Sequence, residues 1–175
     1  LLVYISGLMF IFRHFAGPLA HRFSPVGLMW ISSVLAGFGV LALSYANSPV
    51  TAFLSATIWG IGVCYMWPTM LGVTSERFPR GGALLLGLMG TAGNLSIQFV
   101  LPWMGSIYDE FTNRAQAAGL APEAARASAA PVAFRYVAAL SRVLVVVFGF
   151  IWLRDRAAGG YKVESLEERA RKTPA

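Results

Sequence analysis

The sequence predicts an all-α protein, a polytopic bundle of five helices that each cross a lipid bilayer. Of its 175 residues, 57% are hydrophobic and 13% are charged, whereas an ordinary soluble protein has roughly a quarter charged residues. Five apolar runs are long enough to cross about 30 Å of hydrocarbon as helices, which takes about 20 residues. These runs do not alternate apolar and polar residues, which argues against membrane strands.

The predicted spans begin and end at recognisable signals, and we place them at residues 1–16, 26–46, 50–73, 83–106 and 133–153. Pro25 and Pro49 each follow a serine and start a span, where the missing N–H of proline does no harm. The run from Phe78 to Gly82 predicts a tight turn before the fourth span. Residues 107–132 contain acidic residues and prolines and predict an outer loop, and residues 154–175 predict a solvated tail.

The positions of the basic residues predict the orientation of the chain. Arg22 lies in the first connection, Arg77 and Arg80 lie in the third, and the tail is rich in Lys and Arg. If the spans alternate, these residues share one side, which the positive-inside rule makes cytoplasmic. We therefore predict an integral protein of a bacterial inner (plasma) membrane with a cytoplasmic C-terminus. The net charge is +6, but the basic residues mostly flank long apolar runs, so no nucleic acid partner is expected.

The third span places large aromatic residues beside residues that weaken a helix. Trp59, Tyr65 and Trp67 lie within a few positions of two glycines and Pro68. Helix breaks inside a membrane are tolerated only against protein or water. The segment therefore predicts either a cavity that stacks a sugar ring or an aromatic solute, or ordinary aromatic packing.

The fourth span carries small and amide residues on one helical face. Gly87, Gly90, Thr91, Asn94 and Gln98 recur at helical spacing. Such a stripe packs helices closely, with amides bonding across the interface. Alternatively, it forms a cavity wall that hydrogen-bonds a polar solute.

The sequence lacks the residue clusters that catalysis or metal binding requires. No HExxH, GxSxG or phosphate-loop motif is present, the two histidines lie near the first connection, and the single cysteine, Cys64, reads as a core residue. No enzyme activity, cofactor or metal is therefore predicted. Arg13 and Arg142 lie inside spans, where a charged group is either functional or reaches out to the interface.

The loop after the first span, Gly17 to Pro25, reads Gly-Pro-Leu-Ala-His-Arg-Phe-Ser-Pro. It resembles the loop motif of the major facilitator superfamily (MFS), Gly-x-x-x-Asp-Arg-x-Gly-Arg-Arg, in the weakened form of the second half of those transporters. Gly17 and Arg22 match the motif, whereas His21 and Ser24 replace its acid and its second glycine.

Two further segments agree with this family in order and spacing. Residues 76–80, Glu-Arg-Phe-Pro-Arg, resemble the loop between its tenth and eleventh helices, and residues 105–109 resemble the end of its eleventh helix. The resemblance implies that the five spans are helices eight to twelve, an incomplete six-helix domain. Helix seven and the N-terminal half are then expected upstream of Leu1, which opens the chain inside an apolar run.

The resemblance also implies a function, the transport of a small polar organic solute such as a sugar, nucleoside or carboxylate by alternating access. Transport would be symport or antiport, and the partners would be the solute, the lipid bilayer and the N-terminal half of the same chain. The alternative is a small stand-alone membrane protein that scaffolds a partner through its Gly-rich fourth span.

Site residues follow from the polar and aromatic positions and from the matched motifs. Those expected to contact solute are Tyr65, Trp67, Asn94, Gln98, Trp59 and Arg13. Those expected to take part in gating are Gly17, Arg22, Glu76 and Arg77. An ion pair between Arg22 and Glu76 is expected at the cytoplasmic rim, where opposite charges attract through a lowered dielectric.

Overall fold

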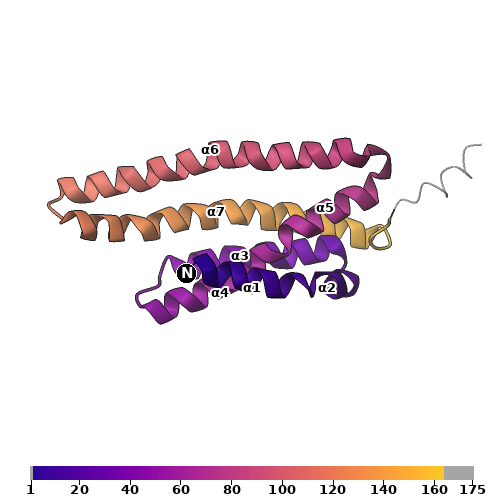
Figure 1. The fold of residues 1–175 in the computed structure, drawn as a ribbon, viewed down its shortest axis with the longest axis horizontal. Coiled ribbons are helices and arrows are strands. Elements are labelled where there is room, and N and C mark those ends of the chain that lie inside the picture. Colours follow the sequence, from indigo (N-terminus) through magenta and orange to yellow (C-terminus); the bar gives the residue numbers. More distant parts are fainter. Residues whose placement is uncertain (1, 164–175) are drawn as a thin grey trace, which may run out of the picture.

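The computed structural model describes residues 2–163, which form helices joined by short turns and contain no strand (Figure 1). The elements, in chain order, are α1 (Leu2–Arg13), α2 (Ala16–Phe23), α3 (Pro25–Leu43), α4 (Pro49–Cys64), α5 (Met66–Arg77), the 3-10 turn η1 (Pro79–Gly81), α6 (Gly82–Ala117) and α7 (Pro122–Ala157). The all-α prediction is confirmed for this part of the chain.

Within residues 2–163, four helical segments are long and apolar enough to cross a membrane, one fewer than we predicted. They are Pro25–Leu43, Pro49–Arg77, Pro79–Ala117 and Pro122–Ala157. The first predicted span, residues 1–16, is instead the short apolar helix α1, followed by a turn and then α2. The described part of α1 has 12 residues, which corresponds to about 18 Å of helix.

α3 and α4 begin at Pro25 and Pro49, where the sequence predicted helix starts, and the serine before each proline caps the helix. The Oγ of Ser24 accepts a hydrogen bond from the N–H of Gly27 at 3.2 Å, and Pro25 opens α3. At the start of α4, Ser48 and Thr51 each accept a hydrogen bond from the other's backbone N–H, the reciprocal arrangement of a capping box. These caps satisfy N–H groups that have no partner within a helix.

The third predicted span is interrupted at Tyr65, which separates α4 from α5. Pro68 follows three residues later and has no N–H to donate to the carbonyl group of Cys64. The break lies in the segment where the sequence predicted a weakened helix.

The predicted outer loop, residues 107–132, is a helical hairpin rather than a loop. α6 and α7 have 36 residues each, continue through Pro102 and Pro131, and meet at a short turn that includes Gly119 (Figure 1). Alanine is the strongest helix former, and this outweighs the acidic residues and prolines. Ala125, Ala129 and Ala133 recur every fourth residue and are buried, so α6 and α7 approach closely here.

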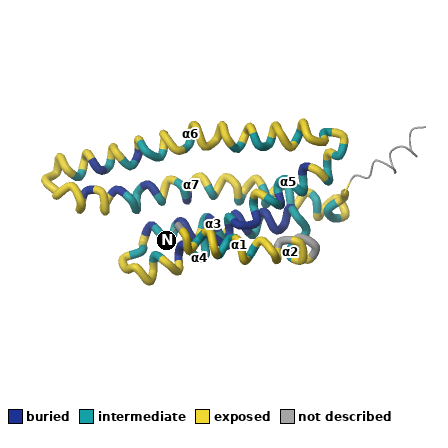
Figure 2. The backbone as a smooth tube through the Cα atoms, in the orientation of Figure 1, coloured by how far each residue is buried: buried dark blue, intermediate teal, exposed yellow. Residues whose placement is uncertain are grey.

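α3 lies at the centre of the bundle and packs against α4, α5 and α7. Figure 2 shows the buried residues concentrated on α3 and the helices beside it, whereas α6 is exposed along most of its length. α3 and α4 are in backbone contact, because a Cβ at Gly62 would lie 2.4 Å from the backbone nitrogen of Ala36. Cys64 is fully buried, which confirms its prediction as a core residue.

α7 ends at Ala157, and the chain then reverses. Gly159 and Gly160 have φ values of 91° and 99°, in the left-handed region that favours glycine. This turn returns the chain so that Tyr161 reaches α5. The predicted tail continues beyond Val163, and its residues 164–175 lie outside the described part of the chain.

Candidate functional site

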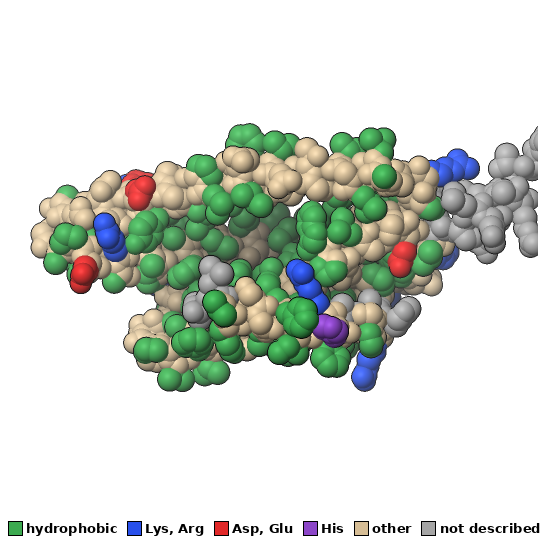
Figure 3. All heavy atoms as spheres, in the orientation of Figure 1, with side chains coloured by type: hydrophobic (Ala, Val, Ile, Leu, Met, Phe, Trp, Pro, Cys, Tyr) green, Lys and Arg blue, Asp and Glu red, His purple; other side chains and the backbone are tan. Residues whose placement is uncertain are grey.

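A cavity of about 550 Å³ lies between α5, α6 and α7, and we call it the α5–α6 cavity. Figure 3 shows a hollow beneath α6 on the face in view. Its volume is in the range of small-molecule sites, about 300 to 1,000 Å³. The residues that line it are Val63, Met66, Trp67, Met70, Gly90, Gly93, Asn94, Ser96, Ile97 and Phe148.

Trp67 and Asn94 are the two predicted solute contacts that the fold brings together in this cavity. The indole of Trp67 lies over Gly93, where an added Cβ would be 3.2 Å from the six-membered ring. The glycine therefore leaves space for the aromatic ring. Asn94 is the next residue on α6, is exposed, and makes no side-chain hydrogen bond within residues 2–163. Its amide can therefore donate to and accept from a bound molecule.

The lining of the α5–α6 cavity carries no charge in the described part of the chain. Met66, Met70 and Phe148 supply apolar and polarizable surface, and Asn94 and Ser96 supply polar groups. An aromatic wall with a few hydrogen-bonding groups suits a flat, uncharged molecule. A carboxylate would find no cationic partner on these walls.

The other four predicted solute contacts do not line this cavity. Tyr65 is 4% exposed and belongs to the core with Leu28 and Cys64. Trp59 packs against Gly39 of α3, and Gln98 is exposed on α6. Arg13 is the exposed last residue of α1.

The cavity also contains residues that sequence reasoning missed. Met66 and Met70 are four residues apart on α5, which places them on one helical face, next to the predicted Trp67. That spacing could have identified Met66 and Met70. Phe148 comes from a uniformly apolar part of α7, and no local signal distinguishes it.

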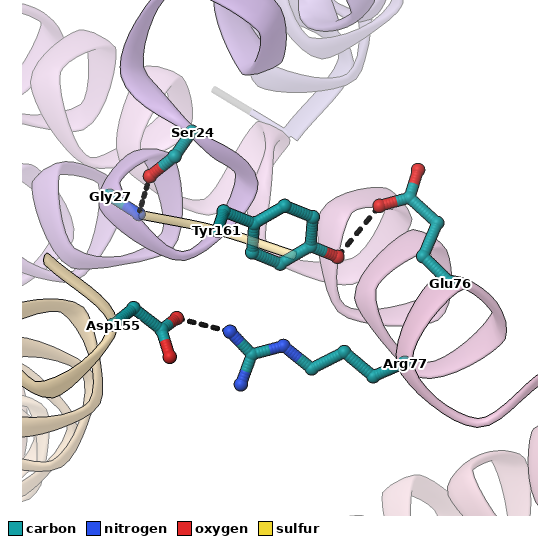
Figure 4. A network of polar contacts seen from close by, with 6 residues as sticks. All are labelled: Ser24, Gly27, Glu76, Arg77, Asp155 and Tyr161. Atoms are coloured by element: carbon teal, nitrogen blue, oxygen red, sulfur yellow. Dashed lines mark hydrogen bonds and ion pairs between the residues drawn. The ribbon is translucent and has the colours of Figure 1, made fainter. Parts of the chain in front are cut away.

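A polar cluster joins the end of α5 to the end of α7, and we call its residues, Glu76, Arg77, Asp155 and Tyr161, the end cluster (Figure 4). Arg77 forms an ion pair with Asp155. The hydroxyl of Tyr161 donates to Oε2 of Glu76 at 2.6 Å. The guanidinium of Arg77 also lies 4.9 Å from the centre of the Tyr161 ring. This cation–π contact joins the Arg77–Asp155 pair to the Tyr161–Glu76 pair.

The environment of Tyr161 stabilises its neutral form. Burial, and then the hydrogen bond to the Glu76 carboxylate and the charge of that carboxylate, raise the pKa of Tyr161 well above its ordinary value. Arg77 opposes these effects and lowers the pKa by a smaller amount. Tyr161 therefore remains a hydrogen-bond donor to Glu76 well into the alkaline range.

The predicted gating residues lie at this end of the bundle, but the expected pair is not formed. Gly17, Arg22 and Glu76 line a second cavity, of about 790 Å³, which we call the basic-end cavity. In the described part of the chain, no ion pair joins Arg22 to Glu76. The Glu76 carboxylate instead accepts a hydrogen bond from Tyr161, and the ion pair at this end joins Arg77 to Asp155.

Comparisons with known proteins do not assign the chain, because no protein-family model, curated protein or solved structure matches it. The geometry of the two cavities and the resemblance of the loop motifs are therefore the basis for a functional proposal.

Proposed function

We propose that the chain is part of a secondary transporter that moves a small, uncharged organic solute across a membrane by alternating access. The observation that carries this proposal is the placement of Trp67 over Gly93, with Asn94 beside it, in the α5–α6 cavity. The helix break at Tyr65 lies next to the cavity. Interrupted helices beside a binding site are typical of secondary transporters.

The chemistry of the cavity narrows the solute classes that the sequence left open. Sugars and nucleosides combine a ring that stacks on an indole with groups that hydrogen-bond an amide. Both fit Trp67 and Asn94, whereas a carboxylate lacks a charged partner in the described lining. We therefore favour a sugar or a nucleoside.

The exposure of α6 is consistent with a second helical bundle that packs against it. None of the residues in its most apolar membrane-length stretch is buried within residues 2–163. The proposal assigns this face to the N-terminal half of an MFS transporter, with the solute between the two halves. It also places the end that carries Arg22, Arg77 and Arg154 in the cytoplasm.

The test measures binding and uptake of labelled sugars and nucleosides by membranes that contain the protein. Trp67→Ala and Asn94→Ala should each weaken binding and uptake by about tenfold or more, because a stacking or hydrogen-bonding group is lost. Trp103→Ala is the matched control. Trp103 lies on α6 and is exposed to about the same extent as Trp67, but it does not line the cavity. Equal effects of Trp67→Ala and Trp103→Ala would reject the proposed site.

A second candidate function, a membrane scaffold, is favoured by the open glycines of α6. An added Cβ at Gly87, Gly90 or Gly105 would meet no atom within 4 Å, so this face could receive another helix. In that case, Gly87→Leu and Gly90→Leu would abolish crosslinking to a partner in membranes, and Trp67→Ala would leave it unchanged. The transporter proposal expects specific solute binding that Trp67→Ala weakens.

A further inference from the structure

We propose that the basic-end cavity binds a phosphate group, carried either by a lipid headgroup or by a free anion. The cavity has a volume of about 790 Å³ and is formed where α2, α3, α5 and the end of α7 meet. It is separate from the α5–α6 cavity and shares no lining residue with it. Phosphate binding here would be independent of solute transport through the α5–α6 cavity.

Two arginines bring positive charge to this cavity. Arg22 extends from α2 and Arg156 from α7, and both line it. Among residues 2–163, neither takes part in an ion pair. Each guanidinium instead lies over an aromatic ring, at 6.0 Å from the centre of Phe23 for Arg22 and 5.5 Å from the centre of Trp152 for Arg156. Both cations are thus held at the wall with donors available for an anion.

The two carboxylates at the same cavity are already engaged, as Figure 4 shows. Asp155 is paired with Arg77, and Glu76 accepts a hydrogen bond from Tyr161. The cavity is lined by two arginines, Arg22 and Arg156, and by two acids, Glu76 and Asp155, so their formal charges cancel. Arg77 lies beside them and gives the group a net formal charge of +1. The end cluster therefore keeps the acids occupied and leaves the two lining arginines for a ligand.

The remaining walls favour a phosphate at a membrane boundary. α3 begins at Pro25, which lines the cavity, so the positive end of its helix dipole faces the ligand space. Phe23, Trp152 and Val163 add apolar surface next to the charges. Basic pockets between apolar helices bind anionic headgroups, and the planar guanidinium matches two phosphate oxygens at once.

The experiment compares two sources of phosphate for the full chain. One arm reconstitutes it in vesicles of phosphatidylcholine, alone or mixed with phosphatidylglycerol, and measures lipid retention by native mass spectrometry and thermal stability. The other adds inorganic phosphate to the detergent-solubilised chain. Retention of phosphatidylglycerol without an effect of inorganic phosphate supports a lipid site, and an effect of inorganic phosphate supports a free-anion site.

Variants of the two arginines decide whether binding occurs in this cavity. Arg22→Gln and Arg156→Gln should each weaken binding about fivefold, and the double variant about thirtyfold. Arg22→Lys and Arg156→Lys keep the charge and should retain more binding than the glutamine variants, which separates charge from folding. Arg80→Gln is the control, because Arg80 is exposed at the same end but does not line the cavity. Binding of neither probe, or an equal loss in Arg80→Gln and the double variant, would overturn the proposal.

Discussion

Gly27 of α3 lies against the indole of Trp152 on α7, so that a Cβ at Gly27 would be 2.9 Å from Nε1 of Trp152. The relationship is reciprocal, because a Cβ at Gly149 of α7 would be 2.9 Å from Nε1 of Trp30 on α3. The two indoles stack with ring centres 5.2 Å apart and planes 7° apart. Each glycine thus makes room for the tryptophan of the opposite helix, which fixes how α3 and α7 pack.

Gly27→Ala and Gly149→Ala should each lower the free energy of unfolding by about 1 to 3 kcal/mol, because the added methyl group displaces an indole from a packed interface. The measurement is thermal or denaturant unfolding in detergent. Gly87→Ala serves as the control, since nothing lies within 4 Å of an added Cβ there. If all three variants behaved alike, the reciprocal packing would not contribute to stability.

Gly62→Ala should destabilise the protein more than Gly27→Ala does. At Gly62 the added Cβ would meet the backbone nitrogen of Ala36 at 2.4 Å, and a helix backbone cannot move aside as a side chain can. α3 and α4 would have to separate. Gly72→Ala, in the same membrane-length segment with no atom within 4 Å, should have little effect. A smaller loss for Gly62→Ala than for Gly27→Ala would contradict the backbone contact.

Asp155→Asn should lower the free energy of unfolding by about 1 to 3 kcal/mol, because it leaves the half-buried Arg77 without its ion-pair partner. The Nε atom of Arg77 is buried and has no hydrogen-bond partner within the described residues. Glu110→Gln is the matched control, since Glu110 and Arg114 form an exposed pair on α6. Its loss should be below about 0.5 kcal/mol. Unfolding curves of equal midpoint for the two variants would contradict this ranking.

Tyr161 should make stability fall at alkaline pH. A tyrosine in the unfolded chain loses its proton near pH 10, whereas the raised pKa of Tyr161 keeps the folded form protonated. The unfolded state then binds fewer protons, so a rise in pH favours unfolding. The stabilisation is complete below about pH 10 and is lost as the pH rises through the pKa of the folded state.

Tyr161→Phe should remove this part of the alkaline loss and cost about 1 kcal/mol at neutral pH through the lost hydrogen bond to Glu76. Unfolding midpoints measured from about pH 8 to about pH 11 test both effects. Tyr45→Phe, which changes an exposed tyrosine at the opposite end, is the control. An alkaline slope identical in Tyr161→Phe and the parent would contradict the role of Tyr161.

The sequence predicted the features that depend on nearby residues. Pro25 and Pro49 begin the helices that follow them, and the third span breaks close to Pro68, because these effects act within one helical turn. Residues 107–132 form a helical hairpin and not the predicted loop, because the helix propensity of alanine outweighs the acidic residues and prolines there.

The site could be predicted only in part, because burial depends on neighbours that are distant in sequence. Tyr65 and Trp67 are two positions apart and lie on opposite helical faces, so only Trp67 lines the cavity. Which face of this segment is buried in the bundle depends on its contacts with α3 and α6, and the local sequence does not determine it. Tyr161 contacts Glu76 from 85 positions away, and no pattern in the sequence connects them.

The length of α6 and α7 has a mechanical consequence. Each has 36 residues, about 16 more than the roughly 20 that cross a bilayer. The turn that includes Gly119 therefore extends about 24 Å beyond a bilayer-length segment that starts at Gly82. A rotation of about 10° of the bilayer-length segment would move the turn by about 4 Å, because the turn lies about 24 Å away from it. A spectroscopic probe attached at the turn would therefore report small angular changes of these helices as displacements large enough to measure.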